Sequence, residues 1–316
     1  MQLSFGKKDA GTFLNKSFLL RHITKDIFTY ILLMPALLLT FIFAYCVMPM
    51  NITAFQDYDI FKGVMGSKFV GLKHFIAIFE MPMFYVAILN TIKLSILTIA
   101  VTFPAPILFA LLINELKDGV LKRVFQSISY LPHFLSSITV IGLAYTMLAK
   151  FGSINDLRVM ILGEETERIN FLMKPAMFIP ILLIISVWKT VGWGSILYLA
   201  AIAAIDPGLY ESSQIDGANR FQQAIHITLP GILPTSIILL IFSMGSLLNG
   251  NFDFVYGLQN PYIDFETIPT IVYKQGILAG DYSMSTAYGL FQGVVSFGLT
   301  YIVNKIAKKF SGISIW

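Results

Sequence analysis

The chain has 316 residues, of which 56% are hydrophobic and only 13% are charged. A typical soluble domain carries about 25% charged residues, so this composition excludes an ordinary soluble protein and indicates that lipid surrounds much of the chain. The formal net charge of +4 is small and the basic residues are dispersed, so nucleic acid is not an expected partner. The single cysteine, Cys46, allows no disulfide framework, and no metal site is expected.

Six apolar segments are long enough to cross a bilayer, which takes about 20 residues. The first begins near Phe28 and lacks a small-residue cleavage site, which predicts a retained span and not a signal peptide. None has the alternating polarity of a barrel strand. We therefore expect an all-α integral membrane protein with one transmembrane domain at 28–310, between tails at 1–27 and 311–316. The predicted spans are 28–50, 86–113, 124–148, 178–205, 231–252 and 284–304.

The distribution of Lys and Arg predicts the orientation, because cytoplasmic loops are enriched in these residues. With the N-terminus in the cytoplasm, the inner segments carry twelve basic residues and the outer segments carry eight. Both tails are then cytoplasmic, and the protein is expected to be a multi-pass protein of the cell membrane. The inner loops are 114–123 and 206–230, and the outer loops are 51–85, 149–177 and 253–283.

The inner loop 206–230 is the most polar stretch between two spans, and its sequence predicts two short helices. Asp206 can cap the first helix and Pro207 suits its first position. Glu211 is expected early in that helix, where the helix dipole favours a negative charge. Gly217 tolerates positive φ and predicts the turn. Prolines at 230 and 234 mark the predicted entry into the fifth span.

The second predicted helix, 218–228, presents Phe221, Ala224, Ile225 and Thr228 on one face, since they are three, four and seven residues apart. This face suits a groove on a cytoplasmic partner, in the manner of other helix-in-groove contacts. The alternative is a surface helix that packs on its own bundle.

The same loop resembles the EAA motif of permeases from ATP-binding-cassette (ABC) importers, in its carbohydrate-type form. Ser212 and Ser213 stand where that family usually has two alanines, and serine is nearly as small. Further similarity, at 129–133, at Trp188 to Trp193 and at 198–202, is to the subgroup that imports oligosaccharides or polysaccharides, such as the alginate importer. The resemblance covers roughly 28–310. The matching positions are Glu211, Asp216, Gly217, Ala218, Phe221, Ile227, Leu229 and Pro230, and Arg220 lies among them.

This resemblance implies a type I importer permease fold, with a cytoplasmic coupling helix between the fourth and fifth spans. It implies as partners a second homologous permease, two ATPase subunits and an extracellular solute-binding lipoprotein, with an oligosaccharide as the substrate. The chain contains no GxxxxGK[ST] sequence. ATP and Mg²⁺ are therefore expected on the ATPase subunits, and this chain is expected to be a transport subunit and not an enzyme.

Several polar residues inside or beside the spans are candidates for the substrate path. A lysine within a span costs about 3 kcal/mol and usually faces the bundle interior or water, and aromatic faces with a few polar groups are typical of ligand sites. Alternatively, the lysine pairs with a carbonyl or carboxylate, the aromatics pack on lipid, and the residues near 250 cap a helix end. A kink is expected at Pro132. The candidates are Trp188, Lys189, Trp193, Asn249, Asn251, Asp253, Tyr288 and Gln292.

Two other classes of membrane protein fit the sequence less well. An ion-coupled secondary transporter usually has inverted repeats and intramembrane carboxylates, whereas the six predicted spans contain no Asp or Glu. An intramembrane enzyme needs a catalytic dyad or metal ligands at membrane depth, and none is evident in the sequence.

Overall fold

The structure is a computed structural model that describes residues 27–249, 251–312 and 314–315. The predicted tail at 1–27 lies outside these residues except for Ile27. Within them, six helical segments are long and apolar enough to span a membrane, which confirms the predicted number. These candidate spans are Ile27–Phe55, Pro82–Asn114, Ser137–Leu162, Pro175–Ala203, Arg220–Gly245 and Tyr282–Lys309.

The first half of the chain contains three long apolar segments, and a segment with two short helices and two strands lies between the first two. Its helices are α2 (Ile27–Thr40), continued by a π turn (Phe41–Tyr45) and a 3₁₀ helix (Met48–Phe55), then α3 (Gly63–Gly66), α4 (Lys73–Glu80), α5 (Pro82–Thr102), α6 (Pro104–Asn114), α7 (Val120–Tyr130), α8 (Ser137–Leu148) and α9 (Ser153–Leu162). The strands β1 (Gln56–Asp57) and β2 (Lys68–Phe69) form a short antiparallel pair.

The second half contains the two longest helices and most of the short ones. Its helices are α10 (Pro175–Ala203), α11 (Pro207–Ile215), α12 (Arg220–Gln223), α13 (Leu229–Gly245), α14 (Phe252–Leu258), α15 (Ile268–Tyr273) and α16 (Tyr282–Ser311). Shorter 3₁₀ and π turns lie at Leu131–Phe134, Phe171–Met173, Ala224–Thr228, Leu247–Asn249 and Lys274–Leu278. Helix α16 ends at Ser311, the first residue of the predicted C-terminal tail.

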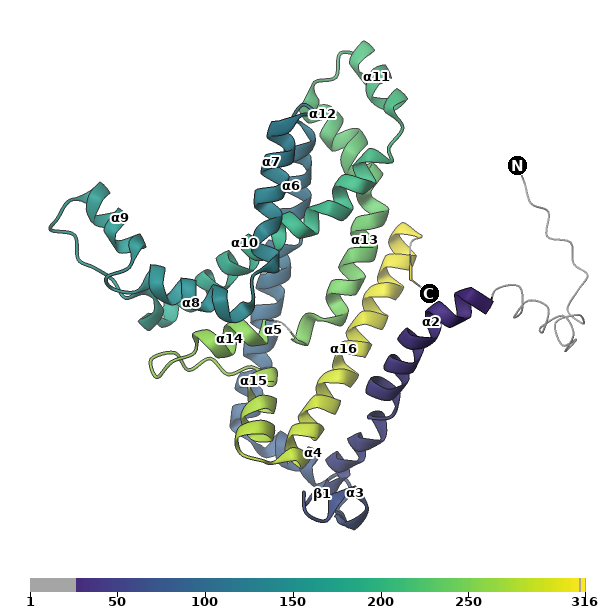
Figure 1. Cartoon of the computed structure of the whole chain (residues 1–316), viewed down its shortest axis with the longest axis vertical. Helices are drawn as coiled ribbons and strands as arrows, with labels where there is room; N and C mark the ends of the chain where they lie inside the picture. The colour runs from purple at the N-terminus through teal and green to yellow at the C-terminus, as the bar shows by residue number, and fades with distance from the viewer. Residues whose placement is uncertain (1–26, 250, 313, 316) are drawn as a thin grey trace, which may run out of the picture.

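The molecule is elongated, with α11 at one end of its longest axis and α3 at the other (Figure 1). Three buried apolar clusters hold the body together; they are centred on Leu182, Phe84 and Tyr198. By contrast, every residue of α2 is exposed in the isolated chain. An apolar helix with no buried face needs lipid or another chain around it.

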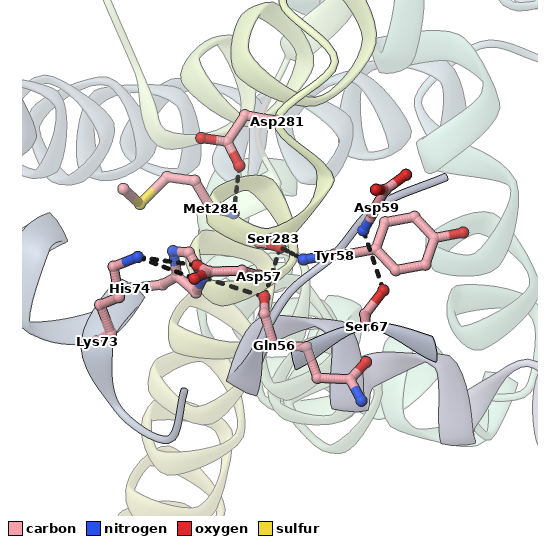
Figure 2. Close-up of polar contacts among 10 residues, drawn as sticks. All are labelled: Gln56, Asp57, Tyr58, Asp59, Ser67, Lys73, His74, Asp281, Ser283 and Met284. Carbon is pink, nitrogen blue, oxygen red and sulfur yellow. Dashed lines mark hydrogen bonds and ion pairs between the residues drawn. The ribbon is translucent and has the colours of Figure 1, made fainter. Parts of the chain in front are cut away.

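A polar cluster fixes the α3 end of the molecule to the start of α16 (Figure 2). The Ser283 hydroxyl donates to the Gln56 carbonyl at 2.6 Å and accepts from the Tyr58 amide at 2.9 Å. Lys73 Nζ lies 2.9 Å from Asp57 Oδ1, and this hydrogen bond lowers the pKa of Asp57 below its ordinary value of 3.8. The segment between the first two spans is therefore a structured element and not a free loop.

The third predicted span, 124–148, is not one helix. Helix α7 ends at Tyr130, and a 3₁₀ turn covers Pro132. Ser136 has an extended backbone and is the N-cap of α8, because its hydroxyl accepts a hydrogen bond from the Thr139 amide at 3.1 Å. Proline removes a helix donor and serine is a strong N-cap. The predicted kink is thus a complete break, and the candidate span starts at Ser137.

The fifth predicted span, 231–252, is shifted toward the N-terminus. The helical segment runs without interruption from Arg220 to Gly245, so Pro230 lies inside it instead of marking its start. A π turn at Ala224–Thr228 precedes this proline, and such wider turns accommodate irregular hydrogen bonding in a helix. The second helix of the predicted inner loop is therefore the beginning of the fifth span.

Candidate functional site

The first candidate site is the hairpin formed by residues 206–228, which projects from one end of the molecule at α11 (Figure 1). As predicted, α11 starts at Pro207, and the Asp206 side chain caps it by accepting from the Gly208 amide at 2.9 Å. None of the α11 residues is buried. A helix that has no buried residue and contacts the body of the protein along one side leaves its other side available to a partner.

The turn of the hairpin depends on Gly217, which has a φ of +81°. No atom lies within 4 Å of the position that a Cβ would take, so only the backbone angle favours glycine here. After the turn, Asn219 caps α12 through a capping box with Gln222. The second helix therefore starts at Arg220, two residues later than predicted.

Side chains fix the angle between the two arms of the hairpin. Gln223 Nε2 donates to Ser213 Oγ at 2.9 Å, and the Tyr210 and Thr228 hydroxyls lie 2.9 Å apart. Ser213, one of the two departures from the family pattern, thus provides a hydrogen bond that alanine lacks. Between the arms lies a hollow of about 310 Å³, lined by Ser213, Asp216, Gly217, Ala218, Gln222, Gln223, His226 and Ile227.

Two details of the predicted coupling loop need correction. Glu211 is the fifth residue of α11 and lies beyond its first turn, where the helix dipole has little effect. The predicted face of the second helix is not continuous, because Phe221 is 73% exposed whereas Thr228 is buried against α11. Of the remaining candidates, Ser212, Arg220 and Pro230 are exposed, and Ile227 and Leu229 are partly buried.

The second candidate site surrounds a helix break midway along the molecule. Helix α13 ends at Gly245, and Asn251, with a φ of +56°, precedes α14. In Figure 1, the end of α13 and helix α14 on either side of this break lie away from both ends of the longest axis. Irregular backbone at membrane depth is tolerated only when it is buried in protein or lines a water-filled cavity.

A cavity of about 580 Å³ lies against this break, between α5, α10 and α13. Most of its hydroxyl groups donate to carbonyls of their own helix; Ser186 Oγ, for example, donates to the Leu182 carbonyl at 2.7 Å. Their lone pairs therefore remain available as acceptors. Its polar lining consists of Ser95, Thr98, Thr102, Ser186, Thr190, Tyr198, Ser243, Ser246, Asn249 and Asn251.

Two features of this cavity are unusual for a packed helix interface. The Thr98 hydroxyl oxygen is buried and has no hydrogen-bond partner among the described residues. Asn251 is the one non-glycine residue in the described chain with positive φ, and its amide donates to Ser186 Oγ at 3.0 Å. A buried polar group without a partner and a rarely adopted backbone conformation are both found more often at functional sites than elsewhere.

The predicted path residues separate into three groups in the structure. Asn249 and Asn251 line the 580 Å³ cavity, and Asn249 and Gln292 are hydrogen-bonded and line a neighbouring cavity of about 650 Å³. Asp253 is exposed in the first turn of α14. Tyr288 is only 1% exposed, packs in a core cluster of the isolated chain and lines neither cavity.

The three residues predicted on α10 lie beside the first cavity and not in its lining. Trp193 is half-exposed and stacks on His133, with ring centroids 4.5 Å apart, and Trp188 is also half-exposed. Lys189 Nζ lies 3.5 Å from Ser137 Oγ and 5.4 Å from the Phe254 ring centroid. The sequence prediction missed most hydroxyls of the cavity, although their three- and four-residue spacing within spans was a usable signal.

Comparisons with known proteins agree with this architecture. Residues 102–310 match the family described as binding-protein-dependent transport system inner membrane component. The chain is 40% identical over 292 residues to the polygalacturonan/rhamnogalacturonan transport system permease protein YteP of Bacillus subtilis (strain 168), with 92% of this chain and 90% of the relative covered.

Two solved structures are also similar. A chain of the bacterial alginate ABC transporter in complex with alginate pentasaccharide-bound periplasmic protein has a TM-score of 0.83 and 36% identity, with 94% of this chain and 99% of that chain covered. A bacterial ABC transporter involved in the import of the acidic polysaccharide alginate has a TM-score of 0.82 and 36% identity, covering 93% and 99%. Both the family match and the identities exceed what a shared fold alone produces. This chain therefore belongs to the family of binding-protein-dependent transport system inner membrane components, as a permease of the ABC importer type.

Proposed function

We propose that this chain forms half of a path through which an oligosaccharide or polysaccharide fragment enters the cell, and that the 580 Å³ cavity is its part of that path. The observation that carries the proposal is the hydroxyl lining beside the break after α13, much of which belongs to the candidate spans Pro82–Asn114 and Pro175–Ala203. Discontinuous helices form substrate sites in many transporters. A path at this position also gives a function to the left-handed backbone of Asn251.

The chemistry of the lining suits a sugar. The side-chain hydroxyls of Thr190, Ser243 and Ser246 each donate to a carbonyl of their own helix, at 2.7, 2.9 and 3.2 Å. A sugar hydroxyl can therefore donate to them and needs no displacement of protein hydrogen bonds. The absence of carboxylates from the cavity lining among the described residues leaves no fixed charge to hold a cation.

The proposed partners are a second homologous permease, two ATPase subunits that bind ATP and Mg²⁺, and an extracellular solute-binding protein. Every residue of α2 is exposed in the isolated chain, which supports the proposal that a second membrane chain packs against this helix. We assign α11 and the adjoining turn to ATPase docking. Movement of this hairpin is expected to reach the cavity through α10 and α13, which adjoin its two arms in the chain and also line the cavity.

Cysteine labelling of the assembled transporter in intact cells tests this assignment. Ile215 at the end of α11 is 87% exposed, and Met65 at the opposite end is fully exposed. Both substitutions, Ile215→Cys and Met65→Cys, are made after Cys46→Ser, because Cys46 is itself exposed. A membrane-impermeant thiol reagent is expected to label position 65 and not position 215, and position 215 is expected to cross-link to an ATPase subunit.

The two positions control each other, because each is expected to react on one side only. External labelling at position 215 would contradict both the cytoplasmic orientation and the docking assignment. If only position 65 is labelled from outside but position 215 forms no cross-link in any nucleotide state, the docking assignment is contradicted and the cytoplasmic orientation is supported.

A further inference from the structure

Lys189 is a cation in the middle of a long apolar helix. It is the fifteenth of the 29 residues of α10, and it is partly buried. Among the described residues, no carboxylate lies within the 4.0 Å expected of an ion pair with its ammonium. A charge at this depth is rare and is normally paired or functional.

The contacts that Lys189 does make compensate its charge only weakly. The Ser137 hydroxyl is 3.5 Å from Nζ, at the outer limit of a hydrogen bond, and the Phe254 ring centroid is 5.4 Å away. Ser137 is also the first residue of α8, and the positive end of a helix dipole disfavours a neighbouring cation. The electrostatic environment of this ammonium therefore favours the arrival of an anion.

This ammonium borders the proposed sugar path. Lys189 follows Ser186 by less than one turn of α10 and directly precedes Thr190, and both of these residues line the cavity. Phe254, on which the ammonium lies, is three residues beyond Asn251, which also lines it. The flexible four-carbon stem of lysine allows the ammonium to turn toward a ligand there.

We propose that Lys189 binds a carboxylate of the transported sugar, and hence that the substrate is an oligosaccharide containing uronic acid residues. This inference rests on the proposed function. A carboxylate accepts charge-assisted hydrogen bonds from an ammonium, and these are stronger than the neutral bonds that the hydroxyl lining offers. The cavity hydroxyls then bind both acidic and neutral sugar rings, and the Lys189 ammonium favours the acidic rings.

The test uses the complete transporter, assembled in nanodiscs with its second permease, ATPase subunits and binding protein. The probes are a galacturonic acid tetrasaccharide and its fully methyl-esterified form, which keeps the rings and linkages and removes the charge. The measured quantity is kcat/KM for sugar-stimulated ATP hydrolysis. The variants are Lys189→Gln and Lys189→Arg, and each is compared with wild type on the same probe, so that the preference of the binding protein cancels.

Lys189→Gln is expected to lower kcat/KM for the acid by about ten- to a hundred-fold, the usual range for a lost hydrogen bond to a charged group. For the methyl ester the loss is expected to stay below about twofold, and Lys189→Arg is expected to retain most of the activity on the acid. Lys93→Gln is the matched control. Lys93 is an exposed span lysine two residues from Ser95, so it faces away from the cavity, and this variant is expected to behave as wild type on both probes.

An equal loss on both probes would overturn the proposal, because it would mean that Lys189 pairs with a carboxylate of the second permease or supports the fold. No loss on either probe would overturn it as well. If wild type responds to neither probe, or to the ester as well as to the acid, the acidic substrate class is wrong. The proposed function is judged separately, by the labelling of position 215 and by uptake of neutral oligosaccharides.

Discussion

Gly217→Val isolates the backbone requirement of the docking hairpin. A β-branched residue at a φ of +81° costs about 1–2 kcal/mol or more, and no neighbouring atom adds a steric clash. That cost reduces the population of the native turn by a factor of about 5–30 relative to its alternatives. The angle between α11 and α12 then varies, and movement of the ATPase subunits is transmitted poorly to the membrane helices.

The assay is the amount of sugar accumulated per ATP hydrolysed in proteoliposomes that contain the complete transporter. Gly217→Val is expected to lower this ratio several-fold, whereas Gly217→Asn is expected to stay near wild type, because asparagine tolerates positive φ. Gly71→Val introduces comparable strain in the segment between the first two spans, at a φ of +61° and without a clash, and is expected to leave the ratio unchanged. The reasoning fails if valine at 217 couples normally, or if the change at 71 uncouples equally.

Three further changes test the remaining parts of the structure. Ser283→Ala removes both hydrogen bonds of a buried hydroxyl and is expected to lower the free energy of unfolding by about 2–4 kcal/mol. The purified complex should then have a lower melting temperature. An unchanged melting temperature would show that Ser283 does not hold the segment between the first two spans in place. Asn251→Gly and Asn251→Ala both lose the hydrogen bond to Ser186, but only alanine also adds about 1–2 kcal/mol of backbone strain at this positive φ. Uptake is therefore expected to fall more in Asn251→Ala than in Asn251→Gly, and equal uptake in the two variants would show that the backbone angle does not matter. Trp193→Ala is expected to raise the KM for sugar, whereas Trp193→Phe can still stack on His133 and is expected to preserve it. Identical KM values for the two variants would show that this aromatic ring does not contribute to the substrate path.

Features that depend on neighbouring residues in the chain were predictable. The apolar runs were long enough to specify six spans, because only a helix satisfies its own backbone in lipid. The start of α11 at Pro207 and the turn at Gly217 follow from capping and φ preferences, which act within a few residues. The break at Ser136 was also encoded locally, as an N-cap three residues before Thr139, although the continuous apolar run obscured it.

Contacts between distant segments were not predictable from a single sequence. Tyr288 and Gln292 are one helical turn apart on α16, yet the first is packed in the core and the second lines a cavity. Lys189 could have met a carboxylate from any other helix, and the packing of α8 and α14 around it shows that within the described chain it does not.

The sequence by itself determined the membrane location, the number of spans and the shape of the polar hairpin, because hydrophobic length, capping and glycine conformations are local properties. Only the tertiary structure decided which side chains share the cavity. Its lining comes from α5, the start of α6, α10, α13 and the segment after α13, which lie up to about 150 positions apart in the chain and meet only through packing.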